Sequence, residues 1–289
     1  MAYQLVQILN ALSFSVLLLL AGLGLMLVLS LMNFINLTHG SFFLLGGYVA
    51  TRWLGEGDSW WLALPASLLV AAVAALLLDR LLFRHFYDRP HLMQVLLTYG
   101  LSIVFTDLMR WGFGSDTLTP TLPEVLDGAV WIAGLPFPTY RLFLIVAGTV
   151  LALLLWFLFE RTRWGSALRA CVSDRVIAET LGIDTRGVFT LGMMLAAALA
   201  GLAGALGAGV LSVHPGLDEE ILLLALLVVV IGGLGSIRGT VLSALLIGFT
   251  TTYASVWFPE FSSALTLAVM ILILVLRPAG LWQARTRLV

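Results

Sequence analysis

A cluster of polar residues interrupts a hydrophobic stretch near the N-terminus of the sequence. Asn33, Asn36, Thr38, His39 and Gly40 lie between two apolar runs. Polar groups at membrane depth are costly unless they are paired or line a cavity, and a helix broken there exposes backbone groups to a ligand. Two interpretations follow. Either Asn36, Thr38 and His39 satisfy one another in a helix-packing knot, or Asn36, His39 and Gly40 contact a solute pathway.

A second interruption is rich in glycine. It reads Gly232-Gly233-Leu-Gly235-Ser236, between two further apolar runs. Glycine permits a tight turn or a close approach of two backbones. Gly232, Gly233, Gly235 and Ser236 therefore mark either a tightly packed structural hinge or a gate in a pathway.

Hydroxyl side chains form two further groups. Thr98, Ser102 and Thr106 are spaced i, i+4 and i+8, which places them on one face of a helix. Such hydroxyls can bond a carbonyl one turn earlier, so packing and a polar pathway lining are both open. Thr251 belongs to a polar cluster at 250–253 that covers several helix faces, so some of these residues must meet protein or a water-filled path.

Other kinds of chemistry are excluded by composition. Cys171 is the single cysteine and the four histidines are scattered, which leaves no disulfide and no zinc-hydrolase motif. The sequence has no lysine, and a P-loop ATPase motif requires one. A net charge of −1 gives no basic field for nucleic acid. We therefore expect no cofactor, no bound metal and no nucleic-acid partner.

Composition also sets the elements that must position these residues. Hydrophobic residues make up 61% of the 289 positions and charged residues 11%, far from the values of about 45–50% and 25% in soluble domains. A membrane span needs about 20 apolar residues. Nine such segments occur, near 5–31, 35–54, 60–82, 92–112, 139–159, 188–211, 220–232, 239–258 and 262–279.

These continuous runs predict an all-α, polytopic bundle of eight or nine transmembrane helices, some of them discontinuous. The second and seventh segments are doubtful as simple spans, because of the polar cluster and the glycine-rich break. We expect residues 1–289 to form one transmembrane domain in a lipid bilayer. In segment 188–211, small residues recur every four positions on two faces, which predicts a central packing helix. They are Ala196, Ala200, Gly204 and Ala208 on one face, and Ala197, Gly201, Ala205 and Gly209 on the other.

The arginines predict the orientation. With nine passes, twelve of the fifteen fall on one side, and positive residues favour the cytoplasm. These twelve are Arg80, Arg84, Arg89, Arg161, Arg163, Arg169, Arg175, Arg186, Arg238, Arg277, Arg285 and Arg287. The N-terminus is then outside and the C-terminus cytoplasmic. Residues 113–138 form an extracytoplasmic cap loop, and residues 160–187 lie in the cytoplasm.

The cytoplasmic segment 160–187 has a helix-forming composition with charges of both signs. Arg175 and Glu179 are spaced i, i+4, which suits a surface helix, and Gly182 is placed to end it. The segment is either a solvated connector or a knob that docks into a partner protein. On the second interpretation the segment resembles the loop by which ABC importer permeases dock their ATPases, and this resemblance implies that Arg169, Asp174, Ala178, Glu179 and Gly182 couple the chain to an ATPase.

The sequence resembles the branched-chain amino acid permease family of bacterial ABC importers. Besides this coupling segment, three further segments carry the resemblance, in order and over nearly the whole chain. They are Asn36-Leu-Thr-His39-Gly40-Ser-Phe-Phe-Leu-Leu-Gly46-Gly-Tyr48, Gly232-Gly-Leu-Gly235-Ser236-Ile-Arg-Gly239-Thr and Leu276-Arg277-Pro278-Ala-Gly280-Leu281. Arg238 departs from the family pattern.

The resemblance implies a permease subunit of the inner membrane that moves branched-chain or related amino acids by ATP-driven alternating access. It also implies a complex with a second homologous permease, two cytoplasmic ABC ATPases and an extracellular substrate-binding protein. The permease itself is then not an enzyme. Urea and short-chain amide permeases share the same patterns and are the alternative substrate class. An ATPase-independent secondary transporter is the rival mechanism, although acids within the spans are nearly absent.

Overall fold

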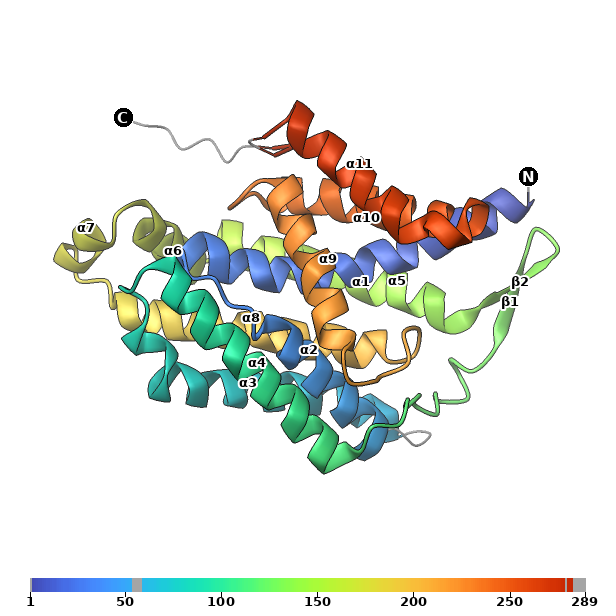
Figure 1. Ribbon diagram of the computed structural model, residues 1–289, viewed down its shortest axis with the longest axis horizontal. Coiled ribbons are helices and arrows are strands. Elements are labelled where there is room, and N and C mark those ends of the chain that lie inside the picture. The colour runs from blue at the N-terminus through green and yellow to red at the C-terminus, as the bar shows by residue number, and fades with distance from the viewer. Residues whose placement is uncertain (1, 54–58, 279, 283–289) are drawn as a thin grey trace.

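The protein is a bundle of long helices with one small hairpin. The computed structural model describes residues 2–53, 59–278 and 280–282, and Figure 1 shows most of the long helices running roughly along the long axis of the molecule, whereas α9 crosses it. The long helices are α1 (Ala2–Met32), α3 (Trp60–Leu81), α4 (His91–Phe113), α5 (Thr139–Arg161), α8 (Thr185–Gly207), α10 (Ile237–Trp257) and α11 (Ser262–Leu276). The shorter ones are α2 (His39–Tyr48), α6 (Arg163–Ser173), α7 (Arg175–Thr180) and α9 (Leu217–Gly232).

Seven helices in the described part of the chain are long and apolar enough to cross a membrane. The expected count of eight or nine is not confirmed, because the segments 35–54 and 220–232 are too short. The first becomes an irregular stretch followed by α2 and a π-helix, Val49–Trp53, and all ten residues of α2 are buried. The second becomes α9, which ends at Gly233 with a φ of +94°.

The centre of the bundle consists of α8 packed against α1, α2 and α3. Almost every residue of α8 from Ala196 to Gly207 is buried. A Cβ at Gly204 would overlap the Phe43 carbonyl of α2, and one at Gly46 would overlap the backbone of Gly201. The small residues therefore let two backbones approach closely, which confirms the prediction of a central packing helix.

The two connecting segments lie at opposite ends of the molecule. Within residues 113–138, β1 (Ala129–Ile132) pairs antiparallel with β2 (Leu135–Pro138), an element that the all-α prediction did not include. Ala133 and Gly134 both have positive φ values, as a two-residue hairpin turn of the primed type requires. Figure 1 shows this hairpin beside the start of α1, whereas α6 and α7 form the opposite tip.

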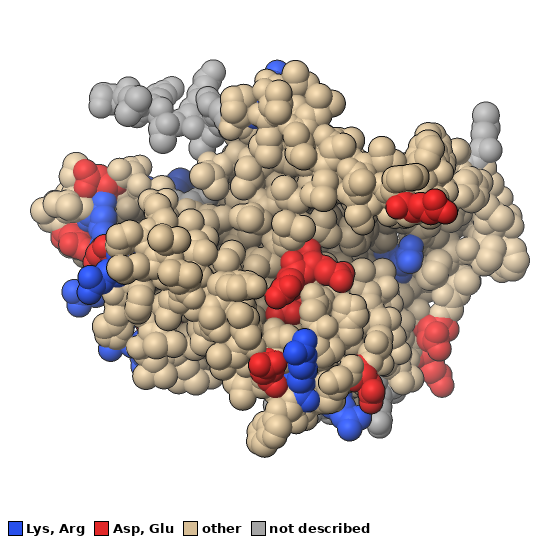
Figure 2. Space-filling model, viewed as in Figure 1, with Lys and Arg blue, Asp and Glu red and all other residues tan. Residues whose placement is uncertain are grey.

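The outer helices present apolar side chains to their surroundings. Leu69 of α3, Leu96 of α4, Val146 of α5 and Ile271 of α11 are all exposed. In Figure 2 most of the visible face carries no charged side chain, and charges of both signs gather at the tip made by α6 and α7 and in a second group at the lower centre and right of the view. This distribution suits a protein whose sides face lipid and whose ends face water.

Candidate functional site

The tip of the molecule is built from two short helices, each with a polar residue at its start. The Thr162 hydroxyl accepts a hydrogen bond from the Gly165 amide at the start of α6, and the Asp174 carboxylate accepts one from the Ile177 amide at the start of α7. These are N-caps, which satisfy backbone donors that have no partner within the helix. Residues 163–180 therefore fold as two helices rather than as an extended connector.

Gly182 ends α7, as expected. Its φ is +82°, its amide donates to the Glu179 carbonyl at 3.0 Å, and the next amide, of Ile183, donates to the Ala178 carbonyl at 3.0 Å. This pair of bonds is the Schellman arrangement, in which glycine is favoured because its φ is positive. The chain then turns directly into α8.

The other coupling residues predicted from sequence are oriented in different directions. Arg169 points back and donates to the Phe159 carbonyl near the end of α5, and Ala178 lies on the buried face of α7. Glu179 accepts hydrogen bonds from Thr185 at 2.5 Å and Arg175 at 3.3 Å. These bonds hold the pKa of Glu179 below its ordinary value. Arg169, Ala178 and Glu179 thus mainly stabilise the fold of the segment 160–187.

Three large aliphatic side chains on α7 and directly after it are exposed beside the charged Arg175 and Glu179, and sequence reasoning missed this apolar patch. Val176, Ile177 and Leu181 are 70%, 57% and 74% exposed. An exposed apolar patch outside the spans marks an interaction site. The sequence signal was available in the three large aliphatic residues between charged ones. We name Val176, Ile177 and Leu181 the α7 patch.

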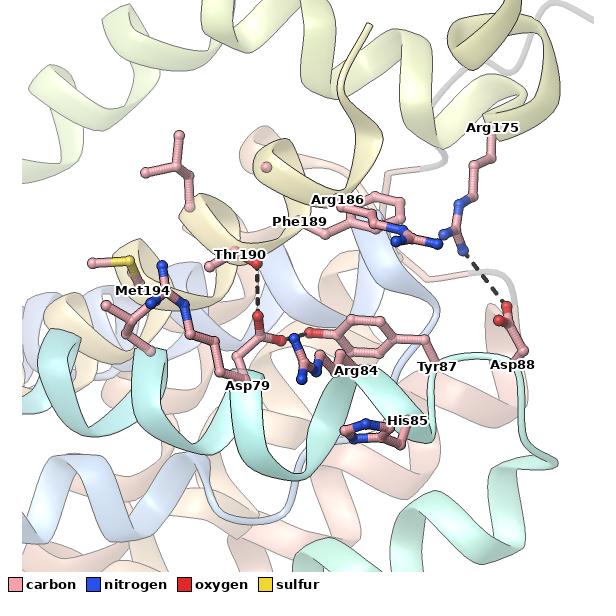
Figure 3. A pocket seen from close by; sticks show the side chains of 14 residues that line it. Asp79, Arg84, His85, Tyr87, Asp88, Arg175, Arg186, Phe189, Thr190 and Met194 are labelled. Atoms are coloured by element: carbon pink, nitrogen blue, oxygen red, sulfur yellow. Dashed lines mark hydrogen bonds and ion pairs between the residues drawn. The ribbon is translucent and has the colours of Figure 1, made fainter.

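Arg175 ties α7 to two other segments. Its guanidinium lies 3.5 Å from the Asp88 carboxylate in the connection between α3 and α4, and 5.3 Å from the centre of the Phe189 ring on α8. Figure 3 shows Arg175 reaching across to Asp88. Sequence reasoning missed this link because nothing local connects the two positions.

A cavity of about 650 Å³ opens beside this link. Asp79, at the end of α3, is buried in its wall, and both of its carboxylate oxygens accept hydrogen bonds, from Tyr87 and from Thr190. Figure 3 shows Asp79 between these two side chains. Burial, followed by the charge of Asp79, raises the pKa of Tyr87. Tyr87 therefore stays neutral and its hydroxyl keeps donating a hydrogen bond to the carboxylate.

The polar break after α1 is bonded to the helices around it more than to itself. The Thr38 amide donates to Asn36 at 3.0 Å, while the Asn36 amide group contacts the sulfur of Met193 on α8 at 3.6 Å. Thr98 of α4 is bonded twice to the segment 35–38. The Thr38 hydroxyl donates to the Thr98 carbonyl at 3.0 Å, and the Thr98 hydroxyl lies 3.2 Å from the Ile35 carbonyl. The break is therefore held by α4 and α8.

His39 and Gly40 begin α2 in the buried centre. The Nε2–H group of His39 donates to the Ala21 carbonyl of α1 at 3.0 Å, and its Nδ1 atom has no hydrogen-bond partner. A Cβ at Gly40 would overlap the backbone carbonyl of Asp218 on α9. These two residues bring α1, α2 and α9 together.

The remaining hydroxyl candidates lie apart from one another. Ser102 is buried and bonds the Tyr99 carbonyl within α4 at 2.7 Å. One turn later, Thr106 donates to the carboxylate of Asp218 at 2.7 Å, a partner not expected from the sequence. Thr251 lies on the other side of the bundle, with its hydroxyl 3.5 Å from that of Thr266 on α11.

The glycine-rich break packs against the end of the chain. The amides of Leu281 and Trp282 donate to the carbonyls of Ile231 and Gly232, at 2.7 and 3.2 Å. A Cβ at Gly239 would overlap the Gly232 carbonyl. Gly233 and Gly235 both have positive φ, and Ser236 caps α10 by accepting from the Gly239 amide at 3.0 Å. Two of the sequence motifs thus meet in space.

Comparison with known proteins places this arrangement in a family. Residues 7–274 match the family described as "Branched-chain amino acid transport system / permease component". The chain belongs to this family. It is therefore a membrane-spanning permease component, as the sequence motifs predicted.

Individual members of the permease family align over nearly the whole chain. The sequence is similar to LivH, a high-affinity branched-chain amino acid transport system permease protein of Escherichia coli K12, with 27% identity, 96% of this chain and 95% of that protein covered. BraD of Pseudomonas aeruginosa, with a corresponding name, is 26% identical with the same coverage. LivM of Escherichia coli K12 is 29% identical over 90% of this chain and 66% of that protein. No solved structure matches the chain.

Within this permease, the predicted site residues fall into separate groups. Asn36, His39, Gly40 and Thr98 meet in the buried centre, with Ser102 one turn further along α4. Gly232, Gly233, Gly235 and Ser236 lie at the junction with residues 280–282, and Thr251 lies between α10 and α11. The residues predicted from the sequence to couple to an ATPase occupy the distant tip.

Proposed function

We propose that the chain is a transmembrane subunit of an ATP-driven importer for branched-chain amino acids. The family assignment supports the permease role, and the names of LivH and BraD support the substrate class. The chain has no lysine and hence no P-loop, so ATP must be hydrolysed by a separate protein. Such a transporter is completed by a second permease, two ATPases and an extracellular substrate-binding protein.

The α7 patch is the observation that carries this proposal. It lies at the end of the molecule opposite the hairpin, outside the spans, on a helix fixed by caps at both ends. A short rigid helix with exposed aliphatic residues suits a cleft in a partner protein. Residues 160–187 are then the coupling segment. Val176, Ile177 and Leu181 contact the ATPase, while Arg169, Asp174, Ala178, Glu179 and Gly182 hold the shape.

The orientation follows the same argument. The tip with α6 and α7 faces the cytoplasm, together with most of the arginines. The hairpin of residues 113–138 and the start of α1 face outward, where the substrate-binding protein delivers its load. In this mechanism, closure of the ATPases on ATP moves the coupling segment and opens the pathway outward, and hydrolysis resets it.

We assign the pathway to the surroundings of the buried break and the glycine-rich junction. The start of α2, a half-helix that begins in the middle of the bundle, lies among Asn36, His39, Gly40, Thr98 and Ser102. A discontinuous helix of this kind supplies backbone groups for a solute. The second part of the pathway lies on α9, on α10 and at the junction between them. This part would move together with α2 and contains Gly232, Gly233, Gly235, Ser236 and Thr251.

Co-purification with the ATPase tests the proposal. We expect Val176→Asp combined with Ile177→Asp to abolish retention of the ATPases encoded beside this gene, because a carboxylate buried unpaired in an interface costs several kcal/mol. Val125→Asp is the matched control, since Val125 is 79% exposed in the segment at the opposite end. Uptake of labelled leucine should require the ATPase. Uptake that persists without any ATPase would show a secondary transporter, and competition by urea but not isoleucine would show the amide class.

A further inference from the structure

The cavity beside the coupling segment is lined by side chains that have no role in the proposed transport steps. It lies where the last turns of α3 and the first turns of α8 meet the connection that contains Tyr87 and Asp88. Both helices are membrane spans, so the cavity lies at the boundary between membrane and water. Its volume of about 650 Å³ falls within the range of roughly 300–1,000 Å³ that is typical of ligand sites.

The residues that line the cavity carry a net positive charge. Arg80, Arg84, Arg175 and Arg186 line it, against Asp79 and Asp88, which leaves two positive charges in excess. Asp79 accepts from two hydroxyl groups, and Asp88 is paired with Arg175 at 3.5 Å. In the described part of the chain no acid forms an ion pair with Arg80, Arg84 or Arg186, and the charge of Arg186 acts on Glu179 only from beyond ion-pair distance. Three guanidinium groups are thus available to an anion.

The flank of the cavity is apolar. Leu76 and Leu191 belong to its wall. Leu77 and Leu81 on α3 and Leu191 on α8 are 54%, 67% and 51% exposed at the same level of the bundle. A ligand with a negative head and a hydrocarbon tail would match both halves of this surface, whereas a small hydrophilic anion would use only the basic half.

We propose that this cavity binds the phosphate headgroup of an anionic phospholipid, whose acyl chains lie against the leucines of α3 and α8. Guanidinium groups bind phosphate oxygens through paired, charge-assisted hydrogen bonds, and basic pockets between membrane helices are sites for anionic headgroups. The bound lipid joins Arg84 before α4 to Arg186 at the start of α8. The lipid therefore holds together the α3–α4 connection and α8, which Arg175 already contacts, and so stabilises the position of α7. The binding itself requires no ATPase and does not depend on the transport function.

Lipid retention by the purified full-length chain tests the proposal. The chain is stripped in detergent and mixed with phosphatidylglycerol or phosphatidylcholine of the same acyl composition, and bound lipid is counted by native mass spectrometry. We expect phosphatidylglycerol to be retained selectively. Arg84→Gln with Arg186→Gln should weaken its binding about 25-fold, at about fivefold for each basic residue near a membrane surface. Arg161→Gln with Arg163→Gln is the matched control, because both are exposed arginines outside the cavity.

Two further probes identify the source of the phosphate. Glycerol phosphate and inorganic phosphate, added at the same concentration, test the head alone. Selective phosphatidylglycerol binding that these anions do not displace supports the lipid. Displacement by either anion at an equal concentration would overturn the lipid assignment and identify a soluble anion. Equal retention of the two lipids, or equal losses in the cavity and control variants, would overturn the site itself.

Discussion

The Arg175 guanidinium at the start of α7 lies 3.5 Å from the Asp88 carboxylate, which precedes α4. Two segments that are far apart in sequence are joined by this contact at the tip of the molecule. Arg175 also bonds Glu179 within α7 and lies over the Phe189 ring of α8. Any movement of the coupling segment must therefore displace the connection between α3 and α4, or break this contact.

Reversing the two charges tests the importance of this contact. Asp88→Arg alone places two arginines face to face, and we expect leucine uptake per ATP hydrolysed to fall because α7 loses its fixed position. Adding Arg175→Asp should restore part of it. Both side chains are exposed, so the contact should contribute only about 0.2–1 kcal/mol to the free energy of unfolding. Transport coupling and stability are measured in the same double-mutant cycle. A double variant no better coupled than the single one would contradict a direct role.

Removing one hydrogen bond to buried Asp79 should destabilise the protein. Thr190→Val keeps the shape but leaves one carboxylate oxygen of Asp79 without its donor. The expected loss is about 1–3 kcal/mol in the free energy of unfolding, measured by SDS titration in mixed micelles. Thr149→Val is the matched control, since the exposed Thr149 hydroxyl bonds a carbonyl of its own helix, and it should change stability by less than about 0.5 kcal/mol. Equal effects of the two variants would show that the Asp79 bond is not structural.

Tyr87 should make the free energy of unfolding depend on pH in the alkaline range. Burial first, and the charge of Asp79 second, raise its pKa in the folded protein. The folded state therefore keeps a proton that the unfolded state releases above about pH 10. The stabilisation is complete below that pH and falls as pH rises through it, by up to about 1.4 kcal/mol per pH unit. The free energy of unfolding is measured between pH 9 and 11 for the wild type and for Tyr87→Phe, and it should depend less on pH in the variant. Parallel curves would contradict this origin.

The long helices and the family motifs could be predicted from the sequence because both depend on local composition. Continuous apolar runs specify α1, α3, α4, α5, α8, α10 and α11, and a glycine at 182 specifies the end of α7. Partners distant in sequence could not be predicted in this way. Asp79 with Thr190, Arg175 with Asp88, and Thr106 with Asp218 are brought together by packing. The expected count of eight or nine spans is not confirmed, because α2 is buried by protein on all sides and does not need the length of a lipid-facing span.

Gly239→Ala distinguishes the two interpretations of the glycine-rich junction. A methyl group there would overlap the Gly232 carbonyl, and overpacking of this kind costs about 1–3 kcal/mol. If the junction is a packing contact, stability and uptake should fall together. If it is mainly a gate, uptake should fall while the free energy of unfolding is unchanged. Gly100→Ala is the control, because Gly100 lies in α4 with no atom near its missing Cβ.

Cysteine labelling distinguishes the two interpretations of the buried break. The wild type gives a low background, because Cys171 is buried and burial raises its pKa, which keeps the reactive thiolate scarce. Thr98 is fully buried and its hydroxyl and carbonyl are both bonded to the segment 35–38. If Thr98 serves packing alone, the variant Thr98→Cys should stay unlabelled in every nucleotide state. Val125→Cys, which is 79% exposed in the segment at the end opposite α7, should be labelled throughout and controls for reagent access. Labelling of Thr98→Cys that appears with ATP and is blocked by leucine would place Thr98 in the pathway, because water reaches it only when the bundle opens around α2.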